Sequence, residues 1–200
     1  EPMPAGGFWR ISPESLEKAI EWQKQHGGKV KWNDPVVYGR DWYYDGKDKY
    51  GYRLYDAAKA MVRNWAPTMS HNLSVNGKSG KTSYNIGLGY LDQSGMSKTA
   101  KKDDFKRYNA SVSVTSELNK YLTLRASSIY SDRNKRYPGI GNTSADPWLY
   151  MYRWSPLFPM GVTEHGNPLK EPSYEMAASN TDNLQNKYYN VNLGFTLNIT

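Results

Sequence analysis

The strongest constraint on the fold is an alternating pattern of apolar and polar residues between positions 71 and 95. Side chains on a β-strand point to opposite faces with a period of two, so this pattern predicts a hairpin with one apolar and one polar face. The turn is expected at residues 78–81. The apolar positions are Leu73 and Val75 before it, and Tyr84, Ile86, Leu88 and Tyr90 after it.

The polar face of this hairpin is the more informative one. The outer face of a soluble sheet usually carries many Lys, Glu and Arg residues. Here the charges lie at the turn and the strand ends, and the middle of the polar face is Asn, Ser and Gly. This composition suits strands that lie between lipid and a hydrated, protein-lined interior.

Three later stretches, 108–115, 122–131 and 189–199, repeat the alternation. Each can supply the roughly 9–11 residues that a tilted transmembrane strand needs. Tyrosines at the ends of these runs would form an interfacial aromatic girdle, although cross-strand aromatic packing in a soluble sheet would also explain them. These tyrosines are Tyr84, Tyr90, Tyr108, Tyr130 and Tyr189.

The sequence therefore predicts an all-β membrane protein, part of a large antiparallel transmembrane β-barrel with short helices in long extracellular loops. Four strands are expected within 67–133, between long loops at 1–66 and 134–186, and a fifth at 187–200. The first loop contains two helical patterns, at 12–26 and 54–65, and the second contains one at 147–154. The four strands are predicted at 69–78, 82–92, 106–117 and 122–132.

The stretch between Ala66 and Arg133 resembles the early barrel strands of SusC/RagA-like TonB-dependent transporters. The resemblance combines three features: the hairpin, the tip YLDQSG at 90–95, and the re-entry segment FKRY at 105–108. Outside this stretch the agreement is only general.

This resemblance implies a barrel of about 22 strands that is closed by an N-terminal plug and energised by TonB. Its members work in the outer membrane of Gram-negative bacteria with a SusD-like surface lipoprotein, and they import oligosaccharides or, as an alternative, oligopeptides. A single-chain bacterial barrel needs at least about eight strands. We therefore expect this chain to be a fragment that lacks the plug and the TonB-contacting region.

Two sets of residues are assigned on this basis. The first is expected to contact ligand or the lipoprotein at the barrel mouth, since aromatic rings offer stacking faces, although the same rings could simply pack the loops. It consists of Trp148, Tyr150, Tyr152, Trp154, Trp42 and Tyr43. The second is expected to face lipid, and it consists of Tyr84, Ile86, Leu88, Tyr90, Val112, Val191, Leu193, Phe195 and Leu197.

Composition excludes several other classes. No apolar run approaches the roughly 20 residues of a transmembrane helix, and the absence of Cys excludes disulfides and thiolate sites. The net charge of +7 is scattered, with small clusters at 98–102 and 133–136. We interpret these clusters as solvated loop charge that can meet lipopolysaccharide phosphates, rather than as a nucleic-acid site, which would require a continuous basic face. No motif predicts a metal, a cofactor or catalysis.

Two further classes remain open. A passive porin or adhesin barrel would share the same strands. A soluble carbohydrate-binding β-sandwich would explain the alternation and the 17 tyrosines and seven tryptophans, and it would stay in solution without detergent.

Overall fold

The computed structural model describes residues 7–139 and 147–199. Residues 1–6, 140–146 and 200, which belong to the two predicted loops and the predicted fifth strand, lie outside this description. The chain divides into two compact units. We name residues 64–96, 102–137 and 181–200 the sheet unit, and residues 1–63, 97–101 and 138–180 the loop unit. The chain is mostly β-sheet with a few short helices.

No helix in the described part of the chain is long and apolar enough to cross a lipid bilayer.

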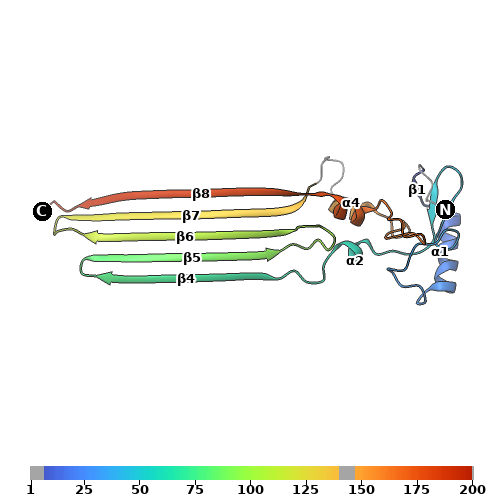
Figure 1. Cartoon of the computed structure of the whole chain (residues 1–200), viewed down its shortest axis with the longest axis horizontal. Coiled ribbons are helices and arrows are strands. Elements are labelled where there is room, and N and C mark those ends of the chain that lie inside the picture. Colours follow the sequence, from blue (N-terminus) through green and yellow to red (C-terminus); the bar gives the residue numbers. More distant parts are fainter. Residues whose placement is uncertain (1–6, 140–146, 200) are drawn as a thin grey trace. The chain divides into compact units, whose positions relative to one another are not determined.

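The sheet unit is a single five-stranded sheet in which each strand lies beside the next one along the chain (Figure 1). The first four strands pair antiparallel in an unbroken register. The strands are β4 (Thr68–Ser79), β5 (Thr82–Ser94), β6 (Asp104–Glu117), β7 (Leu122–Gly139) and β8 (Asn180–Leu197).

Two tight turns fix the register of this sheet. The β4–β5 turn is shorter than predicted, because Ser79 pairs with Thr82 and leaves only two residues between the strands. Gly80 occupies the first of these positions with φ of 58°, a conformation that type II′ hairpin turns require of their first central residue. In the β6–β7 turn, the Asn119 side-chain oxygen accepts hydrogen bonds from the backbone N–H groups of Tyr121 and Leu122, at 2.8 and 3.0 Å.

The last two strands are longer than predicted. The prediction of a loop at 134–186 is wrong at both ends, because β7 continues to Gly139 and β8 begins at Asn180. The added segments are mostly polar and show no regular alternation. They are held by pairing between the neighbouring strands, and Gln185 Nε2 donates to the Asp132 carboxylate at 3.1 Å. Backbone pairing needs no apolar face, so hydrophobic alternation could not show these extensions.

The loop unit combines a small sheet with short helices. Its three strands, in the order β1-β3-β2, are β1 (Trp9–Arg10), β2 (Trp42–Tyr44) and β3 (Lys49–Gly51). Its helices are α1 (Pro13–His26), α2 (Ala57–Met61), α3 (Pro147–Arg153) and α4 (Pro172–Ala178). The predicted helix at 54–65 is therefore too long. It starts only after Asp56, whose side chain accepts from Lys59 N at 2.9 Å, and it ends at Val62, which is extended.

Helix α1 starts as predicted, but it packs through a different face. Ser12 and Ser15 form a reciprocal capping box at its N-terminus. Leu16 and Ile20 lie four residues apart, the spacing of one helical face, yet both are exposed. The buried residues are Ser15, Ala19 and Trp22. The Trp22 indole buries the largest apolar area and donates its Nε1–H to Asp41 at 3.0 Å, and this contact sets the rotation of the helix.

A buried ion pair organises the first part of the loop unit. Arg53 is 1% exposed, and its guanidinium lies 3.3 Å from the Asp41 carboxylate. It also donates to the backbone carbonyls of Lys31, Trp32 and Asp34, at 2.6, 3.0 and 3.0 Å. Burial alone would raise the pKa of Asp41. Hydrogen bonds from Arg40 and a backbone N–H, with the charges of Arg40 and Arg53, hold that pKa below its ordinary value.

The pKa of Glu171 is shifted in the direction opposite to that of Asp41. It caps α4 by accepting from the backbone N–H groups of Ser173 and Tyr174, at 2.7 and 3.1 Å. Only 3% of it is exposed, and this burial raises its pKa above the ordinary 4.5. A carboxyl group whose pKa is raised by folding contributes its full stabilisation at pH values below its pKa in the unfolded chain. That stability is lost as the pH rises through the folded-state pKa.

We expect Glu171→Gln to remove this loss, so that the stability of the loop unit no longer falls between pH 4.5 and neutrality. Asp41 titrates below its ordinary value of 3.8 and does not contribute in this window. Thermal unfolding measured across the pH range tests the expectation. Glu175→Gln, on the exposed side of the same helix, is the control and should leave the profile unchanged. An unchanged profile in Glu171→Gln would contradict the assignment.

Candidate functional site

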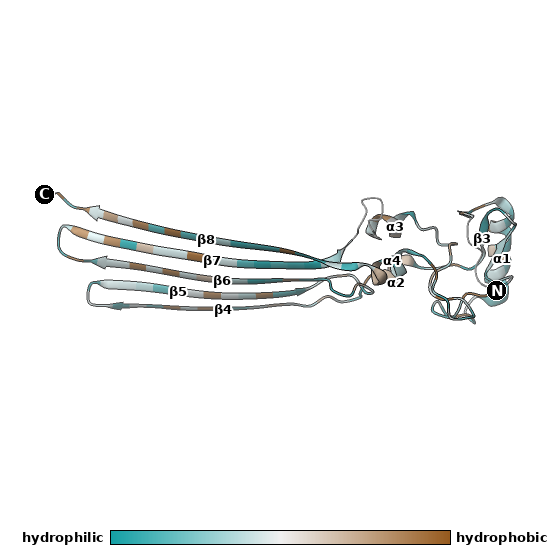
Figure 2. Ribbon diagram, turned by 45° about the horizontal axis from the view of Figure 1, so that its top comes forward, coloured by the Kyte–Doolittle hydropathy of each residue, from teal (hydrophilic) through white to brown (hydrophobic). Residues whose placement is uncertain are grey.

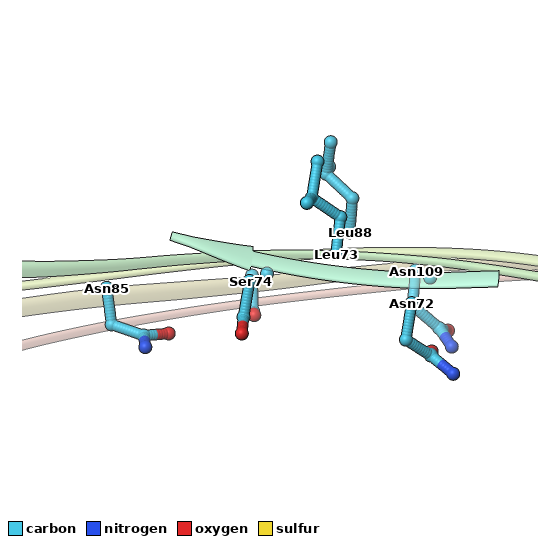
Figure 3. Close-up of a pocket in the computed structure, with 9 residues that line it drawn as sticks. Asn72, Leu73, Ser74, Asn85, Leu88 and Asn109 are labelled. Atoms are coloured by element: carbon cyan, nitrogen blue, oxygen red, sulfur yellow. The ribbon is translucent and has the colours of Figure 1, made fainter. Parts of the chain in front are cut away.

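The register of the sheet unit sorts its side chains onto two chemically different faces. Residues directly opposite each other share a face, and Leu73, Leu88 and Ala110 form one such row across β4, β5 and β6. Figure 3 shows Leu73 and Leu88 on one side of the sheet and the asparagines on the other. The apolar face contains Leu73, Val75, Tyr84, Ile86, Leu88, Tyr90, Tyr108, Ala110, Val112, Val114, Ala126 and Tyr130.

Strand β8 continues this face. Arg125 Nη1 on β7 donates to Thr196 Oγ1 at 3.3 Å, so the even-numbered residues of β8 share the face of Arg125. Arg125 lies on the polar face, since it pairs with Thr115. Its two neighbours in the strand, Leu124 and Ala126, lie on the apolar face. The odd-numbered residues of β8 therefore extend the apolar face. These residues are Tyr189, Val191, Leu193, Phe195 and Leu197.

The apolar face is open rather than packed. Leu88 is 52% exposed, Val191 50%, Phe195 74% and Leu193 81%. Every described residue of the sheet unit belongs to the five strands or to their linking segments, so no further element of this unit covers the face. A soluble monomer rarely exposes a contiguous apolar surface that crosses a whole sheet. The nine residues predicted to face lipid all lie on this open face.

One end of the apolar face passes from aromatic to charged residues along the strands. Tyr90 stands opposite both His71 and Tyr108, with ring centroids 6.4 and 5.0 Å apart. The next row contains the ion pair of Lys106 with Asp92, at 3.3 Å. Beyond it lies a bidentate contact of Arg136 with Asp104, at 2.6 and 2.8 Å. An apolar band that ends in aromatic and then charged rows is typical of a lipid–water boundary.

Figure 2 shows the same gradation in residue hydropathy. Brown and pale bands alternate along β8 toward its C-terminal end, whereas the N-terminal part of β8 is mainly hydrophilic. β7 shows a similar contrast between its two ends.

The polar face is uncharged in its centre. Its middle rows consist of amides, hydroxyls and glycines, apart from Ile129. A shallow hollow of about 380 Å³ lies here, where Gly87 and Gly89 leave the sheet without side chains (Figure 3). A Cβ on Gly87 would lie 2.7 Å from Ser111 Oγ, so a larger residue here would displace the Ser111 hydroxyl and fill part of the hollow. The hollow is lined by Asn72, Leu73, Ser74, Asn85, Gly87, Leu88, Gly89, Asn109 and Ser111.

The aromatic residues predicted at a ligand-contacting mouth separate into packed and exposed side chains. Trp42 is 3% exposed and lies in a cluster with Val36, Tyr55, Met160 and Leu169, so the prediction that it contacts ligand is wrong. An indole gains more from burial than most side chains, and a small sheet supplies the core for it.

The two other tryptophans are also partly packed. Trp154 lies against the cluster of Trp42 and donates Nε1–H to Phe158 O at 3.0 Å. Trp148 packs against a second cluster, of Met61, Ala100 and Met176. Both rings therefore hold the loop unit together.

The tyrosines of the predicted mouth differ from these tryptophans. Tyr152 is 81% exposed and Tyr43 is 43% exposed, with the Lys18 ammonium 5.5 Å from the Tyr43 ring centroid. The side chain of Tyr150 lies outside the described part of the chain. Tyr152 and Tyr43 therefore remain candidates for ligand contact.

Within the described residues, no group of three or more His, Asp or Glu side chains could hold a metal ion.

Comparison with protein-family models gives no match to this chain, and a search of curated proteins gives none either.

Proposed function

We propose that the sheet unit is a segment of a transmembrane β-barrel whose apolar face contacts lipid and whose polar face borders a hydrated lumen. The observation that carries this proposal is that five neighbouring strands expose a continuous apolar face on one side and an uncharged polar centre on the other. Transmembrane barrels alternate in this way, with the apolar side outward.

The length of β8 fits a bilayer. A strand rises about 3.4 Å per residue, so the apolar run of β8 from Tyr189 to Leu197, tilted by about 40°, covers roughly 23 Å. The apolar band of outer-membrane barrels is about 25 Å tall. The edges of β4 and β8 also favour closure with further strands, because unpaired backbone groups are very costly in hydrocarbon.

Within this class we propose an outer-membrane, TonB-dependent importer of oligosaccharides that works with a SusD-like surface lipoprotein. Support comes from the resemblance of residues 66–133 to SusC/RagA-like transporters. The exposed Tyr152 and Tyr43 suit stacking on sugar rings. An oligopeptide importer of the same family is the second candidate.

We expect that deleting the gene for this chain abolishes uptake of labelled oligosaccharide and leaves uptake of monosaccharide unchanged. Collapse of the proton-motive force should have the same effect, because the outer membrane has no energy source of its own. Uptake that survives this collapse would indicate a passive porin. Loss of oligopeptide uptake alone would favour the second candidate, and a chain that remains monomeric in buffer without detergent would favour the soluble sandwich.

Tyr152→Ala, tested in the same uptake assay, is expected to lower affinity for the oligosaccharide severalfold without lowering stability, because the ring is 81% exposed. Tyr121→Ala is the matched control, since Tyr121 is an exposed tyrosine in the β6–β7 turn. Equal affinity in the two variants would reject Tyr152 as a contact residue.

A further inference from the structure

Two arginines stand directly opposite each other on the polar face of the sheet. Arg107 on β6 pairs in register with Arg133 on β7. Directly opposed residues of an antiparallel pair have Cα atoms only about 4.5–5.5 Å apart. Like charges in this position repel and destabilise the sheet. A third cation, Lys135, lies on the same face two residues beyond Arg133.

Three acidic residues at this end of the sheet, Asp92, Asp104 and Asp132, lie on the face opposite to the arginine pair. Asp92 is paired with Lys106 and Asp104 with Arg136, and both carboxylates belong to rows of the opposite face. Asp132 also lies on that face, where it accepts from Gln185. Among the described residues, neither Arg107 nor Arg133 has an ion-pair partner.

Neighbouring polar residues hold one of the two guanidinium groups in place. With the Asn109 amide oriented so that its oxygen faces Arg107, that oxygen accepts from Arg107 Nε at 3.2 Å. The Asn109 nitrogen then donates to Ser131 Oγ at 2.8 Å, and Ser131 is itself buried. This chain of hydrogen bonds uses Nε and leaves the terminal nitrogens of Arg107 available for another acceptor.

We propose that Arg107 and Arg133 form a binding site for an oxyanion, such as a carboxylate or sulfate group, on the polar face of the sheet. Two planar guanidinium groups match the geometry of such anions bidentately, and an anion between them converts the repulsion into two attractions. The site lies one row beyond Asn109, at the end of the hollow on this face. It does not depend on what covers the apolar face. If that face contacts lipid, the site lies on the lumen wall and attracts the anionic groups of solutes.

The test uses the detergent-solubilised protein that contains this chain, unfolded thermally at constant ionic strength while chloride is replaced by sulfate. We expect a saturable rise of the midpoint with sulfate, because an anion that binds only the folded state stabilises it. Arg107→Gln and Arg133→Gln should each weaken the apparent sulfate affinity at least about tenfold. Neither variant should be less stable than the wild type in chloride, because each removes a like-charge contact.

Arg125→Gln is the matched control. Arg125 lies on the same face, but it stands opposite Thr115 rather than another arginine, so its variant should keep the full sulfate response. Arg107→Lys keeps the charge without the planar fork and should lose part of the affinity. The general stabilising effect of sulfate appears equally in every variant and is subtracted by this comparison.

The same measurements identify the source of the oxyanion. If a carboxylate elsewhere in the polypeptide occupies the site, the wild type shows no saturable sulfate response and Arg107→Gln is destabilised in chloride. The site is overturned if the wild type, Arg107→Gln and Arg133→Gln respond identically to sulfate and have equal stability in chloride. A positive sulfate result would stand even if the proposed lipid contact failed.

Discussion

Leu193→Arg is expected to lower the free energy of unfolding of the membrane-inserted protein by about 2–4 kcal/mol, the cost of an arginine near the bilayer midplane on the lipid face of a barrel. Leu193 lies near the middle of the apolar run of β8 and is 81% exposed. The loss would arise from transfer of the guanidinium into hydrocarbon, since no packing contact of comparable size is broken. Denaturant titration in lipid vesicles measures it.

Asn192→Arg provides the matched control on the adjacent residue of the same strand. Its side chain lies on the polar face, where it donates to Asn190 at 2.6 Å. Losing that exposed hydrogen bond should cost at most about 1 kcal/mol. If both variants are equally stable, the apolar face does not contact lipid, because an arginine at an 81% exposed position in water costs almost nothing.

Arg53→Ala should destabilise the loop unit by about 3–5 kcal/mol, the range for breaking a buried ion pair from one side. The variant leaves the buried Asp41 carboxylate without one of its cations, and it leaves the carbonyls of Lys31, Trp32 and Asp34 without their donor. Limited proteolysis of residues 28–56, combined with thermal unfolding, would detect the change.

Arg40→Ala tests whether burial causes this effect. Arg40 contacts the same carboxylate at 2.8 Å, but 33% of its side chain is exposed. A partly solvated ion pair contributes about 1 kcal/mol or less. Similar losses in the two variants would show that the carboxylate, rather than the carbonyl contacts of Arg53, dominates the stability of this region.

The strands of the sheet could be predicted because apolar and polar residues alternate along each one, which shows that its two faces lie in different environments. The first four begin and end within about two residues of the predicted positions, apart from the extension of β7. That extension and the first part of β8 lie in neighbouring strands and are stabilised by backbone pairing. The sequence of a polar segment does not show which strand it will pair with. Helix α4 was missed, although Pro172 at its first position is a start signal. Its N-cap, Glu171, is not one of the residues that usually cap a helix.

The candidate site was predictable to a similar extent. The residues expected to face lipid share one exposed face because side-chain direction on a strand follows from position alone. The aromatic residues of the loops could not be divided into packed and exposed side chains, because Trp42 and Tyr43 are adjacent in sequence and only the three-dimensional arrangement of the small sheet buries one of them. The opposed arginines required the register between β6 and β7, which the sequence does not state.

The neighbour-to-neighbour order of the sheet has a consequence for its assembly. Strands β4 to β7 are joined by connections of two to about nine residues, so each hairpin closes at a small entropic cost and can add to the one before it. About 40 residues separate β7 from β8, and they include the whole of α3 and α4. Because the entropic cost of closing a loop grows with its length, we expect β8 to join the sheet last.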